Sequence, residues 1–94
     1  MNRREAEAIL RAELARLRAE SYDTLVERLL DKQETGERTG DSGTHYQVEV
    51  QAFWDSGVKG NLRVLASIDD GGWTAYVPLT DSFIRSPDGG FVDE

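Results

Sequence analysis

The large apolar residues of the N-terminal helical stretch change face partway along it. Residues 2–34 are rich in helix-forming side chains and carry two apolar stripes. The first stripe consists of Ile9, Leu10, Leu14 and Leu17. The second stripe consists of Tyr22, Leu25, Val26, Leu29 and Leu30. At about 100° per residue the stripes point about 140° apart, so one straight helix cannot lay both on a single sheet.

Two arrangements satisfy this constraint. In the first, the helix bends near Ser21, which with Asp23 two residues later is typical of a new helix N-terminus. In the second, the helix continues, and a row of small residues faces the sheet together with part of the second stripe. That row consists of Ala8, Ala12, Ala15 and Ala19. The Leu10, Leu14 and Leu17 stripe would then be available to another molecule.

Composition limits the class of protein. A chain of 94 residues makes one small domain. It has no apolar run near the ~20 residues of a membrane span and no signal-peptide core, so we expect neither membrane insertion nor export. The absence of cysteine fits a reducing cytoplasm and excludes disulfides. The net charge of −7, most of it in residues 35–94, repels polyanions and argues against nucleic-acid binding.

The C-terminal half alternates with period two. Residues 35–43 contain three glycines among polar side chains, which is typical of a loop. Three strands follow, and each has an apolar face. The first has Tyr46, Val48, Val50, Ala52 and Trp54 on that face. The second has Leu62, Val64, Ala66 and Ile68, and the third has Trp73, Ala75, Val77 and Leu79.

The expected register comes from a tight turn at Asp70-Gly71. This turn pairs inward residues with inward residues. The pairs are Ile68 with Trp73, Ala66 with Ala75, Val64 with Val77 and Leu62 with Leu79. Residues 80–84 are expected to form one helical turn or an irregular segment, and Phe91 and Val92 a short final strand.

These elements predict an α+β fold of two layers. An N-terminal long, bent or straight helix packs on a three- to four-stranded antiparallel meander. The single domain, 1–94, divides into a helical region (1–34), a loop (35–43), the meander (44–79) and a C-terminal segment (80–94). This order of elements resembles that of cystatin-like folds over residues 2–79. The Q-x-V-x-G protease-binding signature of cystatins is missing, so the resemblance implies an arrangement of elements and no activity.

No motif predicts catalysis. His45 is the only histidine, and Glu49 follows it on the same strand face about 13 Å away, too far for a dyad. The sequence has no nucleophile elbow, phosphate-binding glycine loop or calcium-loop spacing. We therefore expect a protein that is not an enzyme and has no cofactor or metal.

The exposed apolar residues favour an interaction module that self-associates as a homodimer or binds another protein. Its candidate interface residues are Leu10, Leu14, Leu17, Phe53, Leu65 and Tyr76. The alternative is a small-molecule-binding domain with an aromatic pocket between helix and sheet. The residues expected to line that pocket are Tyr22, Tyr46, Trp54 and Trp73.

Overall fold

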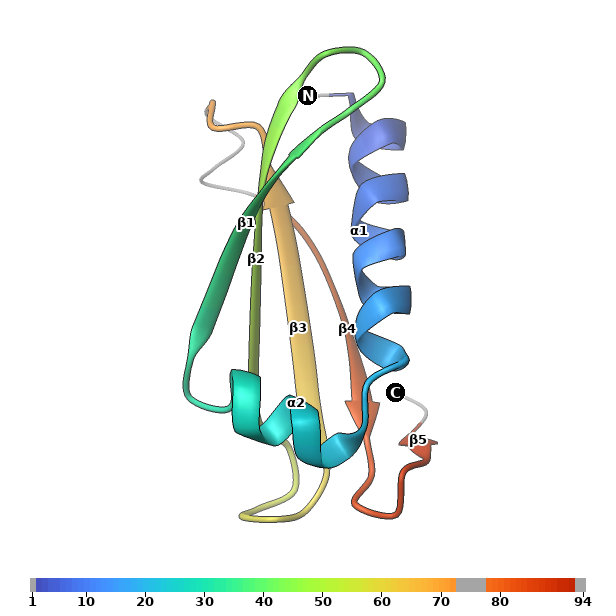
Figure 1. Ribbon diagram of the computed structural model, residues 1–94, viewed down its shortest axis with the longest axis vertical. Coiled ribbons are helices and arrows are strands. Elements are labelled where there is room, and N and C mark those ends of the chain that lie inside the picture. The colour runs from blue at the N-terminus through green and yellow to red at the C-terminus, as the bar shows by residue number, and fades with distance from the viewer. Residues whose placement is uncertain (1, 73–77, 93–94) are drawn as a thin grey trace.

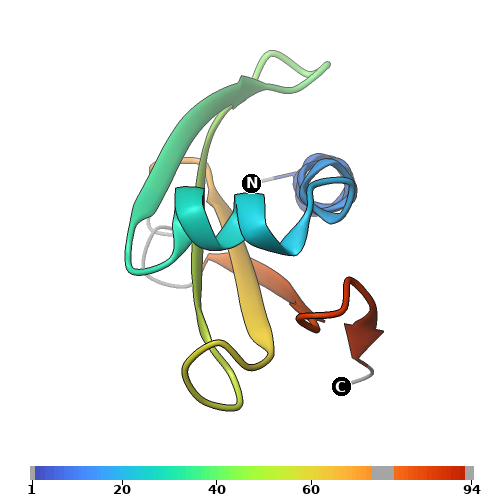
Figure 2. The same ribbon diagram turned by 60° about the horizontal axis from the view of Figure 1, so that its bottom comes forward.

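The helical stretch breaks at Ser21. The computed structural model describes residues 2–72 and 78–92, and it contains helices α1 (Arg3–Arg18) and α2 (Tyr22–Leu29). The Ser21 side chain accepts a 3.1 Å hydrogen bond from the Thr24 N–H, which caps α2. Figure 2 views α1 nearly end-on while α2 lies across the view, so the two helix axes diverge strongly. Of the two arrangements, the bend is confirmed.

Five antiparallel strands form the second layer. They are β1 (Gln33–Thr39), β2 (His45–Trp54), β3 (Leu62–Asp69), β4 (Leu79–Arg85) and β5 (Phe91–Val92). They lie side by side in chain order, and both helices lie on one face of the sheet (Figure 1). The predicted two-layer α+β fold is therefore confirmed, as is the short final strand.

The core lies between the helices and the centre of the sheet. Helix α1 packs on β3 and β4, and α2 packs on β2. Both apolar stripes contribute to the core, because the bend turns the second stripe onto the sheet. Leu14 of the first stripe is 1% exposed and Leu25 of the second is fully buried. The inward residues of β2 and β3 alternate with exposed or half-buried ones, as their sequence pattern predicts.

The predicted loop at 35–43 is wrong for most of its length. Residues Gln33–Thr39 form strand β1, which pairs with β2 from Gln33 opposite Gln51 to Thr39 opposite His45. The sequence pattern did not predict this strand because its inward positions carry no large apolar side chain. Only residues 40–44 turn the chain, with Gly43 at a φ of 87° and the Gly40 N–H donating to the Thr44 carbonyl.

The predicted partner of β3 is also wrong. Leu62 pairs with Arg85 instead of Leu79, and Ile68 pairs with Leu79 instead of Trp73. Val64 and Ala66 pair with Phe83 and Asp81. Residues 80–84 belong to strand β4 instead of a helical turn or an irregular segment. Each residue of β3 thus pairs with a residue six positions further along the chain than predicted. Because six is an even number, the same faces point inward in both registers, and the period-two pattern of the sequence cannot distinguish them. Residues 73–77 of the predicted third strand, which was expected to run to Leu79, lie outside the described residues.

The cap at Ser21 leads to a first prediction. Replacing Ser21 with Ala removes the acceptor for the Thr24 N–H and should lower the free energy of unfolding by about 1 kcal/mol. Ser21→Asn keeps an acceptor and should retain most of the stability. Chemical denaturation followed by circular dichroism measures both changes. Equal losses in the two variants would contradict a capping role.

The burial of Leu14 leads to a second prediction. Leu14→Ala should lower the free energy of unfolding by about 2–5 kcal/mol, because it leaves a cavity in the core. The loss should not depend on protein concentration, since the residue packs within its own chain. Thermal unfolding at two concentrations tests this. A stability loss that grows on dilution would instead place Leu14 in an interface.

Candidate functional site

In the part of the chain that the structure describes, the aromatic side chains predicted to line one pocket do not come together. The Tyr22 ring packs near Trp54, with centroids 6.5 Å apart, and its hydroxyl donates to the Gly60 carbonyl at 2.7 Å. Tyr46 lies eight residues before Trp54 on β2, which separates them by about 26 Å. Its hydroxyl donates to Glu5 Oε1 at 2.8 Å. These side chains therefore belong to opposite ends of the core. Trp73, the fourth predicted member, lies outside the described residues.

The predicted interface divides into two parts. Leu10, Leu14 and Leu17 lie in the core of their own chain, so their assignment to an intermolecular surface is wrong. Phe53 projects from the outer face of the sheet opposite Arg63 and is 40% exposed. Leu65 shares this face and is half-buried.

The predicted register also implies that Leu65 pairs with Tyr76, and this is wrong because Leu65 lies opposite Ser82 on β4. Tyr76 itself lies outside the described residues. Of the five predicted interface residues that the structure describes, Phe53 and Leu65 lie on an outward surface.

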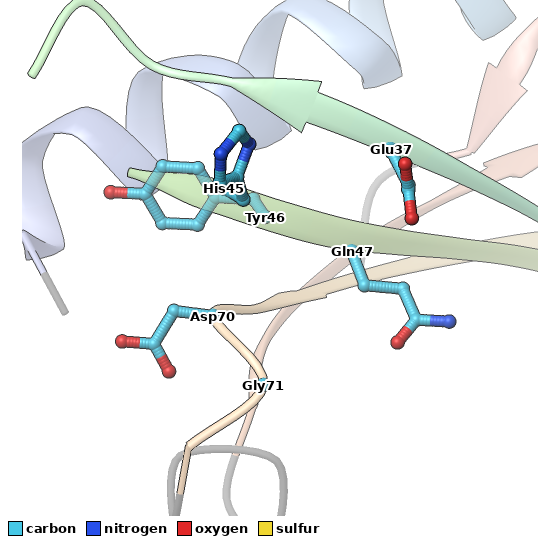
Figure 3. Close-up of a pocket in the computed structure, with 6 residues that line it drawn as sticks. All are labelled: Glu37, His45, Tyr46, Gln47, Asp70 and Gly71. Carbon is cyan, nitrogen blue, oxygen red and sulfur yellow. The ribbon is translucent and has the colours of Figure 1, made fainter. Parts of the chain in front are cut away.

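A polar hollow lies at one end of the sheet (Figure 3). It has a volume of about 460 Å³, and its lining includes Glu37, His45, Tyr46, Gln47, Asp70 and Gly71. The Asp70 carboxylate accepts a 3.1 Å hydrogen bond from the Gly72 N–H, an interaction typical of an aspartate turn. In the described ranges, no group of three or more acidic, histidine or cysteine side chains is placed to hold a metal ion.

Next to this hollow, the Thr39 hydroxyl lies 3.1 Å from His45 Nδ1. A hydroxyl beside an imidazole is the first part of a nucleophile–base pair. Both residues are exposed, however, and the surrounding water prevents the electrostatic preorganisation on which activated nucleophiles depend. The pair therefore gives no geometric support for catalysis.

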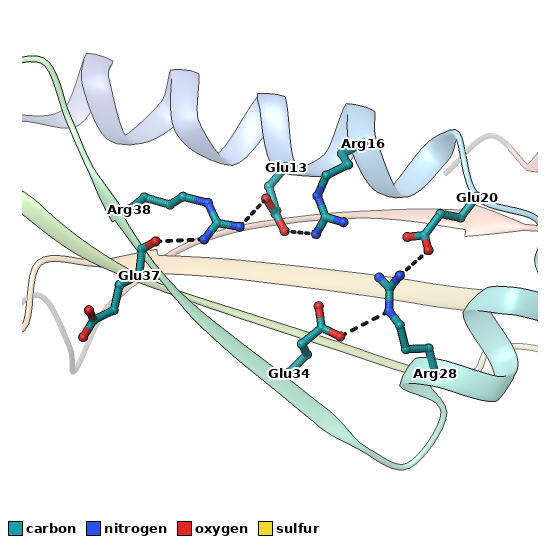
Figure 4. A network of polar contacts seen from close by, with 7 residues as sticks. All are labelled: Glu13, Arg16, Glu20, Arg28, Glu34, Glu37 and Arg38. Atoms are coloured by element: carbon teal, nitrogen blue, oxygen red, sulfur yellow. Dashed lines mark hydrogen bonds and ion pairs between the residues drawn. The ribbon is translucent and has the colours of Figure 1, made fainter.

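A charged network joins α1 to the inner face of β1 (Figure 4). The Glu13 side chain is 7% exposed and accepts hydrogen bonds from Arg16 of its own helix and Arg38 of β1, the latter at 3.1 Å. Arg38 reaches Glu13 by lying across Gly36, where an added Cβ would come within 2.9 Å of Arg38 Nη1. Sequence reasoning missed Glu13, although it lies between Leu10 and Leu17 on the buried face of α1.

A second part of the network joins α2 to the same strand. Arg28 of α2 forms ion pairs with Glu20, in the segment between the helices, and with Glu34 of β1. The Arg28 Nε atom lies 3.2 Å from Glu34 Oε2. Charged side chains thus occupy the space between the helices and β1 that apolar residues fill elsewhere.

The network changes the ionisation of Glu13. Burial acts to raise the pKa of this carboxyl, but hydrogen bonds and positive charge from Arg16 and Arg38 outweigh it, so the pKa is lowered. At the other end of α1, hydrogen bonds from Ser42 and Tyr46 lower the pKa of the Glu5 carboxyl.

The outer edge of β1 has no neighbouring strand in the described chain, although Arg38 Nη1 donates a 2.8 Å hydrogen bond to the outward Glu37 carbonyl. Within residues 2–72 and 78–92, β1 pairs with β2 alone, and it forms one border of the sheet. The Gly40 N–H points toward β2, where it donates to Thr44. Because backbone groups alternate along a strand, those of Gly36 also point toward β2, whereas those of Thr35 and Glu37 point outward. We call this border, Gln33–Thr39, the β1 edge.

The comparisons with known proteins give no identification: the chain matches no family model, no curated protein and no solved structure. Neither helix of the described chain combines the length and apolarity of a membrane span.

The lowered pKa of Glu13 leads to a third prediction. A carboxyl whose pKa is lower in the folded state contributes stability above its unfolded pKa and loses it as pH falls through the folded value. The free energy of unfolding should therefore begin to decrease as the pH falls toward the ordinary glutamate pKa of about 4.3, and should continue to decrease below it. Glu13→Gln should make this decrease shallower and reduce stability at pH 7 by about 1–2 kcal/mol.

The matched control is Glu27→Gln, at an exposed position on α2. Denaturant titrations at several pH values should give this variant the pH profile of the unchanged chain. If Glu13→Gln also kept that profile, the buried carboxylate would not be coupled to folding.

Proposed function

We propose that this protein is a non-enzymatic protein–protein interaction module that self-associates through its sheet. The open β1 edge carries the proposal. It is a seven-residue border strand with outward backbone groups that no other strand of the described chain pairs. Such a border is a template for pairing with a strand of another molecule.

The distribution of apolar residues supports a role for the sheet and not for the helices. The leucines of the first apolar stripe are buried in the core, so α1 has no exposed leucine surface that could bind a partner. Phe53 is exposed on β2, two residues beyond Gln51, where the β1–β2 ladder begins. A small domain gains burial by oligomerising, and an aromatic side chain beside an open strand adds to that gain.

The distribution of charge favours the same border. A chain of net charge −7 repels its own copies over most of its surface. The β1 edge is more balanced, since it carries Glu34 and Glu37 together with Arg38. Association through this border therefore meets less repulsion than association through the acidic turns.

The fourth prediction concerns the solution mass. Light scattering coupled to size-exclusion chromatography, over a hundredfold range of concentration, should show a species of twice the 10.5 kDa chain mass. Its fraction should rise with concentration or be complete throughout. A single 10.5 kDa species at every concentration would reject self-association.

A further inference from the structure

We infer that the β1 edge binds the β1 edge of a second copy, antiparallel and centred on Gly36. This inference rests on the proposed self-association and specifies its geometry. Gly36 is the middle residue of β1, with Glu34 two positions before it and Arg38 two positions after it. When two copies run antiparallel about Gly36, each Glu34 lies opposite the partner's Arg38.

The backbone restricts the registers available. The outward N–H and C=O groups belong to the odd-numbered residues of β1, as the Gly40–Thr44 hydrogen bond establishes. An antiparallel ladder must place these groups opposite one another in the two copies. Three registers do so and keep at least five residues of β1 paired, and they are centred on Thr35, Gly36 or Glu37.

The three registers differ in which charged side chains they place opposite one another. Centring on Glu37 places that carboxylate opposite its own copy, which is destabilising. Centring on Thr35 leaves Arg38 outside the ladder and places Glu34 opposite Gly36. Centring on Gly36 pairs all seven residues and creates two contacts of opposite charge.

The glycine at the central position fits the same register. In this arrangement Gly36 falls at a pair that is not hydrogen-bonded, where the two Cα atoms approach to about 4.5 Å. Glycine places no side chain there. The space over Gly36 stays available to the Arg38 guanidinium that crosses it.

The pairing also extends the charged network. Glu34 and Arg38 are 43% and 41% exposed, so each keeps capacity for a further partner. Glu34 already pairs with Arg28, and Arg38 already donates to Glu13 and to the Glu37 carbonyl. Placing Arg38 of one copy beside the partner's Glu34 joins two networks into one run of alternating charge. Networks of this kind contribute more than isolated surface ion pairs.

The absence of cysteine makes this register directly measurable, and it is the fifth prediction. Thr35 and Glu37 are exposed neighbours on the outer face of the β1 edge. In the Gly36-centred register Thr35 lies opposite the partner's Glu37, at a Cα separation of about 5.5 Å that suits a disulfide. Like positions are diagonal neighbours, about 7–8 Å apart and too far to bridge.

The experiment mixes the Thr35→Cys chain with the Glu37→Cys chain under mild oxidation. Intact mass under non-reducing conditions identifies which chains are joined. The mixed disulfide should exceed either homodisulfide at least fivefold. A mixture of Thr35→Cys with Glu27→Cys, which alters an exposed position on α2, measures random collision and should give only background.

Each alternative has its own signature. A homodisulfide dominant in Thr35→Cys or in Glu37→Cys alone would overturn the Gly36-centred register in favour of one of the other two. A dimer by light scattering without cross-linking above the Glu27→Cys control would overturn edge pairing while leaving self-association intact. A monomer at all concentrations would reject both proposals.

Discussion

The break at Ser21 is the constraint on which the structure depends. Two apolar stripes about 140° apart reach one sheet only if the helix divides between them. Five leucines on the two helices are buried as a result, namely Leu10, Leu14, Leu17, Leu25 and Leu29. Burial contributes about 2 kcal/mol for each, whereas the Ser21 cap contributes about 1 kcal/mol. Apolar burial therefore drives the bend, and the cap determines where it occurs.

The bend also explains why the inner face of the sheet is polar at β1 and apolar at β2 and β3. With α1 over β3 and β4 and α2 over β2, neither helix covers β1 with apolar side chains. The gap is filled by Glu13 and Arg38 on one side and by Arg28 and Glu34 on the other. Burying the Glu13 carboxylate is costly, and two guanidinium partners offset the cost. The polar inner face of β1 is thus a consequence of short, divergent helices.

The structure could be predicted from the sequence where apolar burial alone determined it. Alternation along β2 and β3 predicted their inward residues, because apolar burial alone determines that face. It failed for β1, where Glu34 and Arg38 form ion pairs and the Arg38 guanidinium crosses Gly36, so that apolar burial does not mark the inward face. The β4 register failed because a shift of six residues preserves every face.

The candidate site shows the same division. Phe53 was expected on the outward face from its position in the alternation, and the structure places it there. Leu10 and Leu14 were assigned to an interface because composition does not say whether a helix bends. Glu13 was missed because the role of a single charged residue within an apolar stripe depends on which side chain faces it in the fold, and the sequence does not show that. Its partner Arg38 is 25 residues away in the chain.

A charged border strand ordinarily protects a sheet from unwanted pairing, since an incoming strand must bury those charges without compensation. The β1 edge carries this protection in Glu34, Glu37 and Arg38. Because Glu34 and Arg38 are spaced equally on either side of Gly36, this protection does not act against one particular partner. A second copy in the Gly36-centred register compensates both charges, whereas an unrelated strand, or the same strand shifted by two residues, does not. The same side chains that exclude other strands would therefore select this one, and the selectivity would come from the cost of mismatched pairings more than from the strength of the matched one.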